Sequence, residues 1–371
     1  MRRFLFMILV VFLIVIGASY MEEGVKTEAK EDFKTFFESG ELQNIAASMI
    51  STFQSLFESI KDQVDLSPEG EPQQEVEKPV LSVPSEQTFS IHNVQIGSQK
   101  EEVEAILGEP QRSSSNEYGH NWFTYHQNYQ NFVQVMYNNT EQVVGLYTNQ
   151  DLIASSKNIH LDTPREHVLA QLGTPLTRIQ KGFVYYQLQD DADYDVFQLD
   201  DSYVTIFYDI HEGNTLTSLQ IIHKGIEGDK KSFYASGSES LKEGFEWQMF
   251  DLTNATRVQH GLGILTWDER VRKTARKHSA DMAENAYFDH TNLQGQSPFD
   301  RMLADQITFS VAGENLAYGQ FSSIFAHEGL MNSEGHRKNI LKAEFDHLGV
   351  GVAFNSESHP YYTQNYFSQS K

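Results

Sequence analysis

The strongest constraint on the fold is a pattern that occurs twice in residues 91–230, at an offset of 65 residues. In each copy, a segment with helix-forming residues ends in Leu-Gly-x-Pro, at 107–110 and again at 172–175. Glycine can adopt the positive φ that closes a helix, and the proline two residues later prevents the helix from continuing. Val103 of the first copy aligns with Val168 of the second. The pattern therefore predicts two copies of one folding unit in tandem.

Each copy is expected to begin with a short strand, at 93–96 and 158–161, and to continue after its helix with aromatic and β-branched runs. These runs lie at 122–125, 132–137 and 143–147 in the first copy, and at 183–186, 203–208 and 219–222 in the second. Such composition favours strands. Residues 91–230 are thus predicted to form two small α+β units, each an antiparallel meander packed against its helix.

A second feature is a block of titratable side chains between Trp267 and Leu341. The block contains His278, His290, Glu314, His327 and His336. Apolar residues recur every three or four positions along 268–284, which predicts an amphipathic helix with His278 on its buried side. His290 follows the end of that helix, and His336 follows a glycine that interrupts the next helical segment. Both imidazoles are therefore expected at the ends of elements, where they can face a cavity.

Seven motifs occur in order through this part of the chain. They are Thr-Asn-Ala-Thr-Arg at 253–257, Leu-Thr-Trp-Asp at 265–268, His-Ser-Ala-Asp-Met at 278–282, Tyr-Phe-Asp-His at 287–290, Gly-Glu-Asn-Leu-Ala at 313–317, Met-Asn-Ser-Glu-Gly-His-Arg at 331–337 and Tyr-Tyr-Thr-Gln-Asn at 361–365. Together they resemble the bacterial branch of the CAP superfamily, which includes cysteine-rich secretory proteins, antigen 5 and plant pathogenesis-related proteins. The resemblance covers residues 241–367. The preceding repeat resembles the CAP-associated amino-terminal domain.

The resemblance implies an α-β-α sandwich over residues 238–371, with a central cleft that two histidines and two acidic residues line in the animal members. Carried over by position, these are His290, Glu314 and His336. The second acid is absent, because Ser333 stands in its place with Glu334 beside it. This departure puts a four-ligand metal site in doubt. Strand alternation leaves Gln364 as a further candidate for binding a ligand in the cleft.

Two imidazoles and one carboxylate can bind zinc and leave one coordination position open. The sequence thus gives a candidate divalent-metal site formed by His290, Glu314 and His336. The favoured function is a surface-binding module whose cleft takes a metal, lipid, glycan or peptide. The alternative is a metal-dependent hydrolase of envelope peptides or glycans, and Ser333 activated by His336 is a second catalytic arrangement. A purely structural role for the domain is a third interpretation.

Other residues in the motifs have structural interpretations. Asn254 and Arg257 lie one turn apart on a helix and are suited to hold a loop by hydrogen bonds. His327, like His278, is expected to be buried. Arg337 and Asn339 are expected to brace the loop that carries His336.

The chain begins with two arginines and an apolar run, which predict a signal anchor at 1–21 and an outward-facing remainder at the cell membrane. A cleaved signal and a secreted protein are the alternative. Residues 22–65 include an amphipathic helix at 41–65, which either self-associates, lies on the membrane or packs on a neighbouring domain. Four prolines among glutamate, glutamine and serine indicate an extended linker at 66–90.

Composition excludes one class of partner. The 371 residues include 51 acidic and 28 basic side chains, for a formal net charge of -23. Such a surface repels phosphate backbones, so we do not expect nucleic acid as a partner. Cysteine is absent, so the exported α+β domains must be stable without disulfides.

Overall fold

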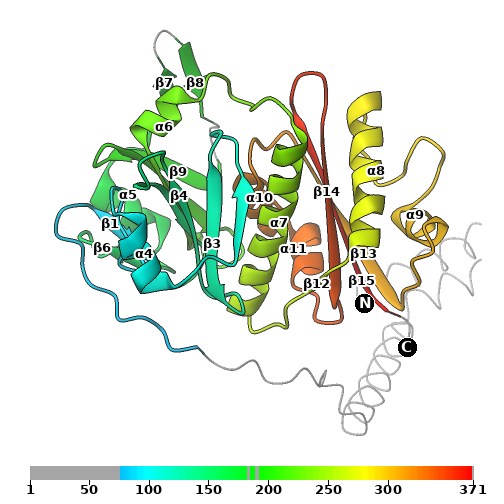
Figure 1. Ribbon diagram of the computed structural model, residues 1–371, viewed down its shortest axis with the longest axis horizontal. Helices are drawn as coiled ribbons and strands as arrows, with labels where there is room; N and C mark the ends of the chain where they lie inside the picture. The colour runs from blue at the N-terminus through cyan, green and yellow to red at the C-terminus, as the bar shows by residue number, and fades with distance from the viewer. Residues whose placement is uncertain (1–75, 182–183, 189–191, 370–371) are drawn as a thin grey trace, which may run out of the picture. The chain divides into compact units, whose positions relative to one another are not determined.

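The computed structural model describes residues 76–181, 184–188 and 192–369 (Figure 1). The expected signal anchor at 1–21, the amphipathic region at 22–65 and the first part of the linker lie outside these residues. Among the described residues, no helix has both the length and the apolar character needed to cross a bilayer. The described part of the linker is largely exposed, with Val80 at 89% and Val83 at 71%, but its start is held on the protein. There, the Gln130 side chain accepts a hydrogen bond from the Val76 backbone, and Asn131 donates to the Glu77 carbonyl.

The amino-terminal half of the described chain is mainly β-structure. Its elements are β1 (Phe89–Ile91), α4 (Lys100–Leu107), β2 (Arg112–Ser115), β3 (Asn121–Gln127), β4 (Gln130–Tyr137), β5 (Val143–Thr148), β6 (Ile153–Ser155), α5 (Arg165–Leu172), β7 (Arg178–Lys181), β8 (Val184–Gln187), β9 (Tyr194–Leu199), β10 (Ser202–Asp209), β11 (Thr215–His223) and α6 (Lys224–Asp229). Seven of the strands form one antiparallel sheet in the order β2-β3-β4-β5-β11-β10-β9. Helices α4 and α5 end at Gly108 and Gly173, both with positive φ, as the repeated motif predicts.

One prediction for this half is wrong. Residues 93–96 and 158–161 do not form strands, because Asn93 and Asn158 adopt positive φ and turn the chain. The short strands β1 and β6 lie just before these turns and pair with each other. The two predicted units lie in one sheet, because β5 pairs with β11 and joins all the strands of both meanders, except the β7–β8 hairpin.

The carboxy-terminal half is an α-β-α sandwich, as expected. Its elements are α7 (Glu239–Gln259), β12 (Thr266–Trp267), α8 (Glu269–Asn285), α9 (Pro298–Ala304), β13 (Val311–Tyr318), α10 (Ser323–Met331), α11 (Glu334–Ile340), β14 (His347–Phe354) and β15 (Pro360–Ser368). The sheet order is β12-β14-β15-β13, so β13 is an edge strand. Figure 1 shows α8 and α9 on one side of this sheet and α7, α10 and α11 on the other. The predicted helix at 268–284 corresponds to α8, and His278 is buried in it.

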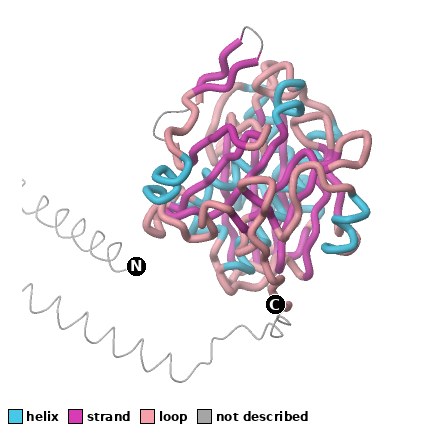
Figure 2. The backbone as a smooth tube through the Cα atoms, turned by 90° about the vertical axis from the view of Figure 1, so that its left-hand side faces the viewer, coloured by secondary structure: helices cyan, strands magenta, loops and turns pink. Residues whose placement is uncertain are grey.

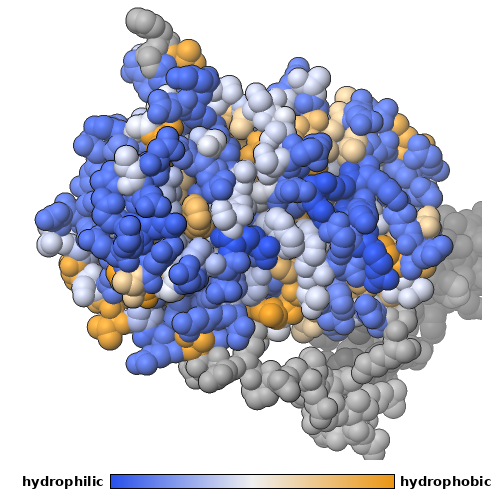
Figure 3. Space-filling view, viewed as in Figure 1, coloured by the Kyte–Doolittle hydropathy of each residue, from blue (hydrophilic) through white to orange (hydrophobic). Residues whose placement is uncertain are grey.

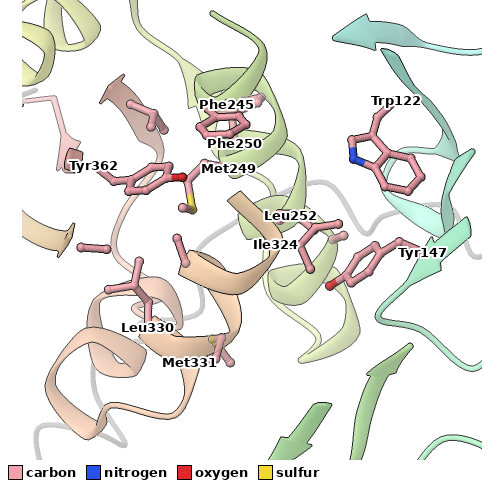
Figure 4. Close-up of a cluster of buried hydrophobic side chains, with 14 of the residues drawn as sticks. Trp122, Tyr147, Phe245, Met249, Phe250, Leu252, Ile324, Leu330, Met331 and Tyr362 are labelled. Carbon is pink, nitrogen blue, oxygen red and sulfur yellow. The ribbon is translucent and has the colours of Figure 1, made fainter. Parts of the chain in front are cut away.

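The two halves share a hydrophobic core along α7. Trp122 and Tyr147 of the seven-stranded sheet pack into the same cluster as Leu252 of α7 and Ile324 of α10 (Figure 4). Polar contacts accompany this core. Arg112 of β2 forms an ion pair with the buried Asp251 of α7, at 3.0 Å. A common core of this kind holds the sandwich against the seven-stranded sheet.

A buried carboxylate lies at the same boundary. Glu328 of α10 accepts hydrogen bonds of 2.7 Å from the hydroxyls of Tyr147 and Ser218, both in the seven-stranded sheet. Burial raises the pKa of Glu328 from 4.5 to about 7, and the two hydroxyl donors only partly oppose this shift. The acid is therefore easier to ionise in the unfolded chain than in the folded protein.

This difference predicts a pH dependence of stability. Below a pH of about 4.5, Glu328 is protonated in both the folded and the unfolded chain and does not lower the free energy of unfolding. As the pH rises from about 4.5 to about 7, the acid ionises in the unfolded chain but not in the folded one, so the folded state loses stability. We expect Glu328→Gln to reduce this loss by about 3 kcal/mol, from a pKa difference of roughly 2.5 units. Urea unfolding at pH 5 and pH 8 measures the change. Burial also raises the pKa of Glu117 and Asp251, so part of the loss remains.

The control is Glu334→Gln, because the Glu334 side chain is 76% exposed. It should leave the pH dependence as in the wild type. If Glu328→Gln also leaves the dependence unchanged, Glu328 is ionised in the folded protein and the proposed linkage is wrong.

Candidate functional site

The candidate site lies along the edge strand β13, at two consecutive residues whose side chains leave the sheet on opposite faces. Glu314 faces the α8 side, where its carboxylate accepts a hydrogen bond of 2.9 Å from His290 Nδ1. Asn315 faces the α11 side, where its amide donates to the His336 carbonyl at 3.1 Å. The two imidazoles thus approach the same strand edge from different layers. We refer to His290, Glu314 and His336 as the histidine site.

His290 is held by the segment that follows α8. This helix ends at Ala286, which adopts a left-handed conformation (φ 54°) and turns the chain. The His278 ring then bonds the Asp289 carbonyl at 2.9 Å, and Arg301 of α9 donates to the His290 carbonyl at 2.7 Å. Both contacts fix the backbone around His290, whose own side chain is about half exposed.

Arg301 is a member of the site that the sequence analysis missed. Its guanidinium donates to Glu314 Oε2 at 2.6 Å, and both side chains are almost fully buried. Arg301 therefore links the His290 backbone to the carboxylate that binds the His290 ring. Its position in the last turn of a short helix gives no periodic signal of this role.

His336 lies in the first turn of α11. Its Nδ1 is 2.8 Å from Ser333 Oγ, and the Ser333 hydroxyl makes no capping bond to the helix. Neighbouring Glu334 instead pairs with Lys338 at the exposed surface, at 2.7 Å. Of the two residues in the position of the missing acid, Ser333 is the one that contacts a histidine of the site.

The predicted role of Gln364 is not supported by its position. This side chain is completely buried, donates to Thr253 of α7 at 3.0 Å and accepts from Asn315 at 3.2 Å. It lies between the sheet and α7, so its amide is used in packing the layers. Strand alternation correctly implies a buried amide here, but it does not distinguish a cleft from a helix interface.

The two imidazoles have opposite electrostatic environments. The hydrogen bond to Glu314 raises the pKa of His290 and outweighs partial burial. Burial lowers the pKa of His336, and the nearby charge of His290 lowers it further. His290 therefore remains protonated to a higher pH than His336. At a pH between the two pKa values, the site presents one imidazolium donor and one neutral imidazole.

The donor set does not fit a metal held by all three residues. Both Glu314 oxygens are occupied, one by His290 and the other by Arg301, and the arginine charge opposes a cation there. In the part of the chain that the structure describes, no three histidine or acidic side chains are placed to hold a metal ion together. Metal coordination by this set would require the Glu314–Arg301 ion pair to open.

The structural roles predicted around the site have mixed outcomes. Asn254 is confirmed as a loop-holding residue, because its amide bonds both the N–H and the carbonyl of Leu265. Buried His327 bonds Thr256 at 2.7 Å. Arg337 makes a local contact of the predicted kind, because its guanidinium donates to the Met331 carbonyl at 3.5 Å. The same guanidinium also reaches Asp209 of β10 at 2.6 Å and pairs the sandwich with the seven-stranded sheet, which was not predicted. A sequence motif does not reveal such a partner 128 residues away.

Fold and site together define an α-β-α sandwich with paired imidazoles at its sheet edge, preceded by a seven-stranded antiparallel domain. Residues 96–233 match the CAP-associated N-terminal family, and residues 250–366 match the cysteine-rich secretory protein family. The chain belongs to the bacterial CAP superfamily and carries the CAP-associated domain before its CAP domain.

Relatives and solved structures agree with this assignment. The chain is 31% identical to the membrane protein YlbC of Bacillus subtilis, over 74% of this chain and 82% of that protein. It is 40% identical to Bacillus subtilis YkwD over 38% of this chain and 53% of that protein. An extracellular SCP-domain protein from Bacillus anthracis superposes with a TM-score of 0.66 at 28% identity, covering 80% of this chain and all of that one. A Staphylococcus aureus cysteine-rich secretory protein shares the fold, with a TM-score of 0.60 at 14% identity and coverage of 74% and 91%.

Proposed function

We propose that the protein is a membrane-tethered binding module outside the cytoplasm, and that its histidine site takes a glycan or peptide of the cell envelope. The observation that supports this proposal most directly is the His290–Glu314 hydrogen bond, which raises the pKa of a half-exposed imidazole at the edge of the sheet and so favours its protonated form. A protonated imidazole donates from Nε2 to carboxylates, carbonyls and hydroxyls, which are the acceptors of peptides and glycans. The tether rests on the apolar segment at 1–21 and on the relative named as a membrane protein.

Apolar side chains around His290 also support binding. Phe288 and Leu293 of the same segment are 49% and 60% exposed, and Phe299 of α9 is 43% exposed. Figure 3 shows the α9 side with hydrophobic spots among mainly hydrophilic residues. Exposed aromatic and aliphatic groups beside a charged donor suit a ligand that has both apolar and polar faces.

The test is cosedimentation of the protein with purified peptidoglycan sacculi. We expect His290→Ala to weaken binding by about 10-fold or more, because the variant loses a charged hydrogen-bond donor to the ligand. His336→Ala should weaken binding to the same degree, because it removes the second imidazole of the site. Wild-type binding should also weaken as the pH rises through the raised pKa of His290. The matched control is His160→Ala in the other half of the chain. Equal binding by all four proteins would contradict the proposal.

A hydrolase is the alternative function. The contact between Ser333 and His336 favours hydrolysis by an activated serine, whereas a metal-dependent reaction would require the Glu314–Arg301 ion pair to open. Zinc titration calorimetry on the wild type and on His290→Ala tests the metal. Identical heats of zinc binding for the two proteins would show that His290 is not a zinc ligand. Turnover of peptidoglycan fragments that is abolished in His336→Ala would instead make the protein an enzyme.

A further inference from the structure

A cavity of about 330 Å³ lies on the seven-stranded sheet and has no part in the histidine site. None of the residues that line it belongs to that site. Its floor is the face of β9, β10 and β11. Its walls come from the β7–β8 hairpin, from the segment after α6 and from the start of α10 in the CAP domain. Figure 1 shows the hairpin beside α6, and in Figure 2 the same hairpin extends outward at the top of the view. The volume is within the range of small-molecule sites.

Seven of the 17 residues that line the cavity are aromatic. Tyr186 of the hairpin stacks with Phe233 after α6, with ring centroids 6.3 Å apart, and Phe233 packs edge-on against Phe321 at 5.0 Å. Phe321 in turn contacts Phe325 of α10 at 4.3 Å. These rings link the hairpin to the CAP domain and enclose an apolar volume suited to an aromatic or branched aliphatic group.

Two polar donors face this apolar space. Gln220 of β11 lines the cavity and is 2% exposed, and its amide nitrogen has no hydrogen-bond partner. A buried donor without a partner is costly, and a ligand oxygen would satisfy it. Lys230 also lines the cavity, with its ammonium over the rings of Phe321 at 4.3 Å and Tyr118 at 5.3 Å.

The surrounding acids leave the lysine charge available to a ligand. Glu227 forms an ion pair with Lys181 on the cavity wall. Glu117 is buried and neither of its carboxylate oxygens has a hydrogen-bond partner. Burial raises the pKa of Glu117 to about 7, so this acid is largely neutral below that pH. Burial lowers the pKa of Lys230, and the charges of Glu117 and Glu227 oppose this shift. A ligand carboxylate beside the ammonium would favour its charged form further.

We infer that this cavity binds a small amphiphilic carboxylate, with its aromatic or branched aliphatic body among the rings and its carboxylate between Gln220 and Lys230. Such a carboxylate has two possible sources, a free organic acid and the C-terminal residue of a peptide. Both present the same chemistry to the cavity. The site is independent of the proposed role of His290 and His336.

The test uses the full chain and three probes in titration calorimetry: 3-phenylpropionate, the peptide Gly-Gly-Phe, and 3-phenylpropanol. We expect 3-phenylpropionate to bind, and the neutral 3-phenylpropanol to bind about 10-fold more weakly or not at all, because it lacks the charge. Binding of Gly-Gly-Phe as well would identify peptide C-termini as ligands. If 3-phenylpropionate binds and Gly-Gly-Phe does not, the ligands are small free acids. Absence of binding by both carboxylates, or equal binding of the alcohol, would overturn the inference.

Gln220→Leu and Lys230→Met should each weaken 3-phenylpropionate binding by about 10- to 100-fold. His290→Ala, which leaves the cavity intact, should bind as the wild type does. An unchanged affinity in both cavity variants would refute the assignment.

A measurement on the wild type covers the case in which these variants do not fold. Saturating 3-phenylpropionate should slow acetylation of Lys230 by at least several-fold, measured by mass spectrometry. The internal control is Lys78, whose side chain is 73% exposed and lies outside the cavity. Equal acetylation of Lys230 with and without the probe would also refute the assignment.

Discussion

Replacing Arg257 with alanine is expected to lower the free energy of unfolding by about 3–5 kcal/mol, the largest loss among the changes considered, because a buried charged hydrogen-bonding group is removed. The side chain is 1% exposed. Its guanidinium donates to the carbonyls of Gly263, Ile340 and Lys342 at 2.8–2.9 Å and to that of Phe345 at 3.3 Å. All four carbonyls would lose a donor at once.

The geometry also predicts the result of a conservative change. Arg257→Lys keeps the charge, but one ammonium cannot reach carbonyls that the planar guanidinium contacts in several directions. It should recover only part of the lost stability. Urea unfolding followed by circular dichroism measures both variants, with Arg270→Ala as the control because Arg270 is mainly exposed. A loss below about 1 kcal/mol for Arg257→Ala would show that water replaces the guanidinium at these carbonyls.

Replacing Gly351 with alanine is expected to destabilise the protein by about 3 kcal/mol, at the upper end of the effects of overpacking. A Cβ at this position of β14 would lie 2.1 Å from the Arg276 nitrogen and 2.3 Å from the Ala275 carbonyl carbon, both in the backbone of α8. Neither backbone atom can rotate away as a side chain does. The helix would have to move from the sheet, and the segment that carries His290 would move with it.

The matched control is Gly335→Ala in the first turn of α11, where an added Cβ has no atom within 4 Å. This variant should be neutral or slightly more stable, because alanine favours a helix. Thermal unfolding of both variants, together with the sacculus-binding assay, separates the effect on stability from that on the site. A Gly351→Ala protein as stable as the wild type would mean that α8 is not held closely against β14.

The candidate site shows which residues sequence motifs can identify and which they cannot. They identified His290, Glu314 and His336, and the structure places the first two in direct contact and the third near them. They did not identify Arg301, because its importance depends on the distance between α9 and β13. For the same reason, residue types alone suggested a metal site, whereas in the structure the Glu314 carboxylate is already paired with the Arg301 guanidinium.

Contacts between the two halves of the chain were the least predictable. Asp209 with Arg337, and Tyr147 with Glu328, are pairs separated by more than 120 residues. Periodicity describes neighbours along one element, and it contains no information on which distant element lies opposite. The joining of the two predicted meanders through β5 and β11 is a contact of the same kind, which periodicity did not reveal.

The sequence by itself determined the local elements that carry strong chemical signals: the helix ends at Gly108 and Gly173, the amphipathic helix α8, the strand runs and the two imidazoles at element ends. Local conformation follows from backbone freedom and from the period of apolar residues, which are properties of adjacent residues. Only the tertiary structure decided which buried polar groups became partners. Burial makes every unpaired donor or charge costly, and the available partners are set by the packing of whole layers.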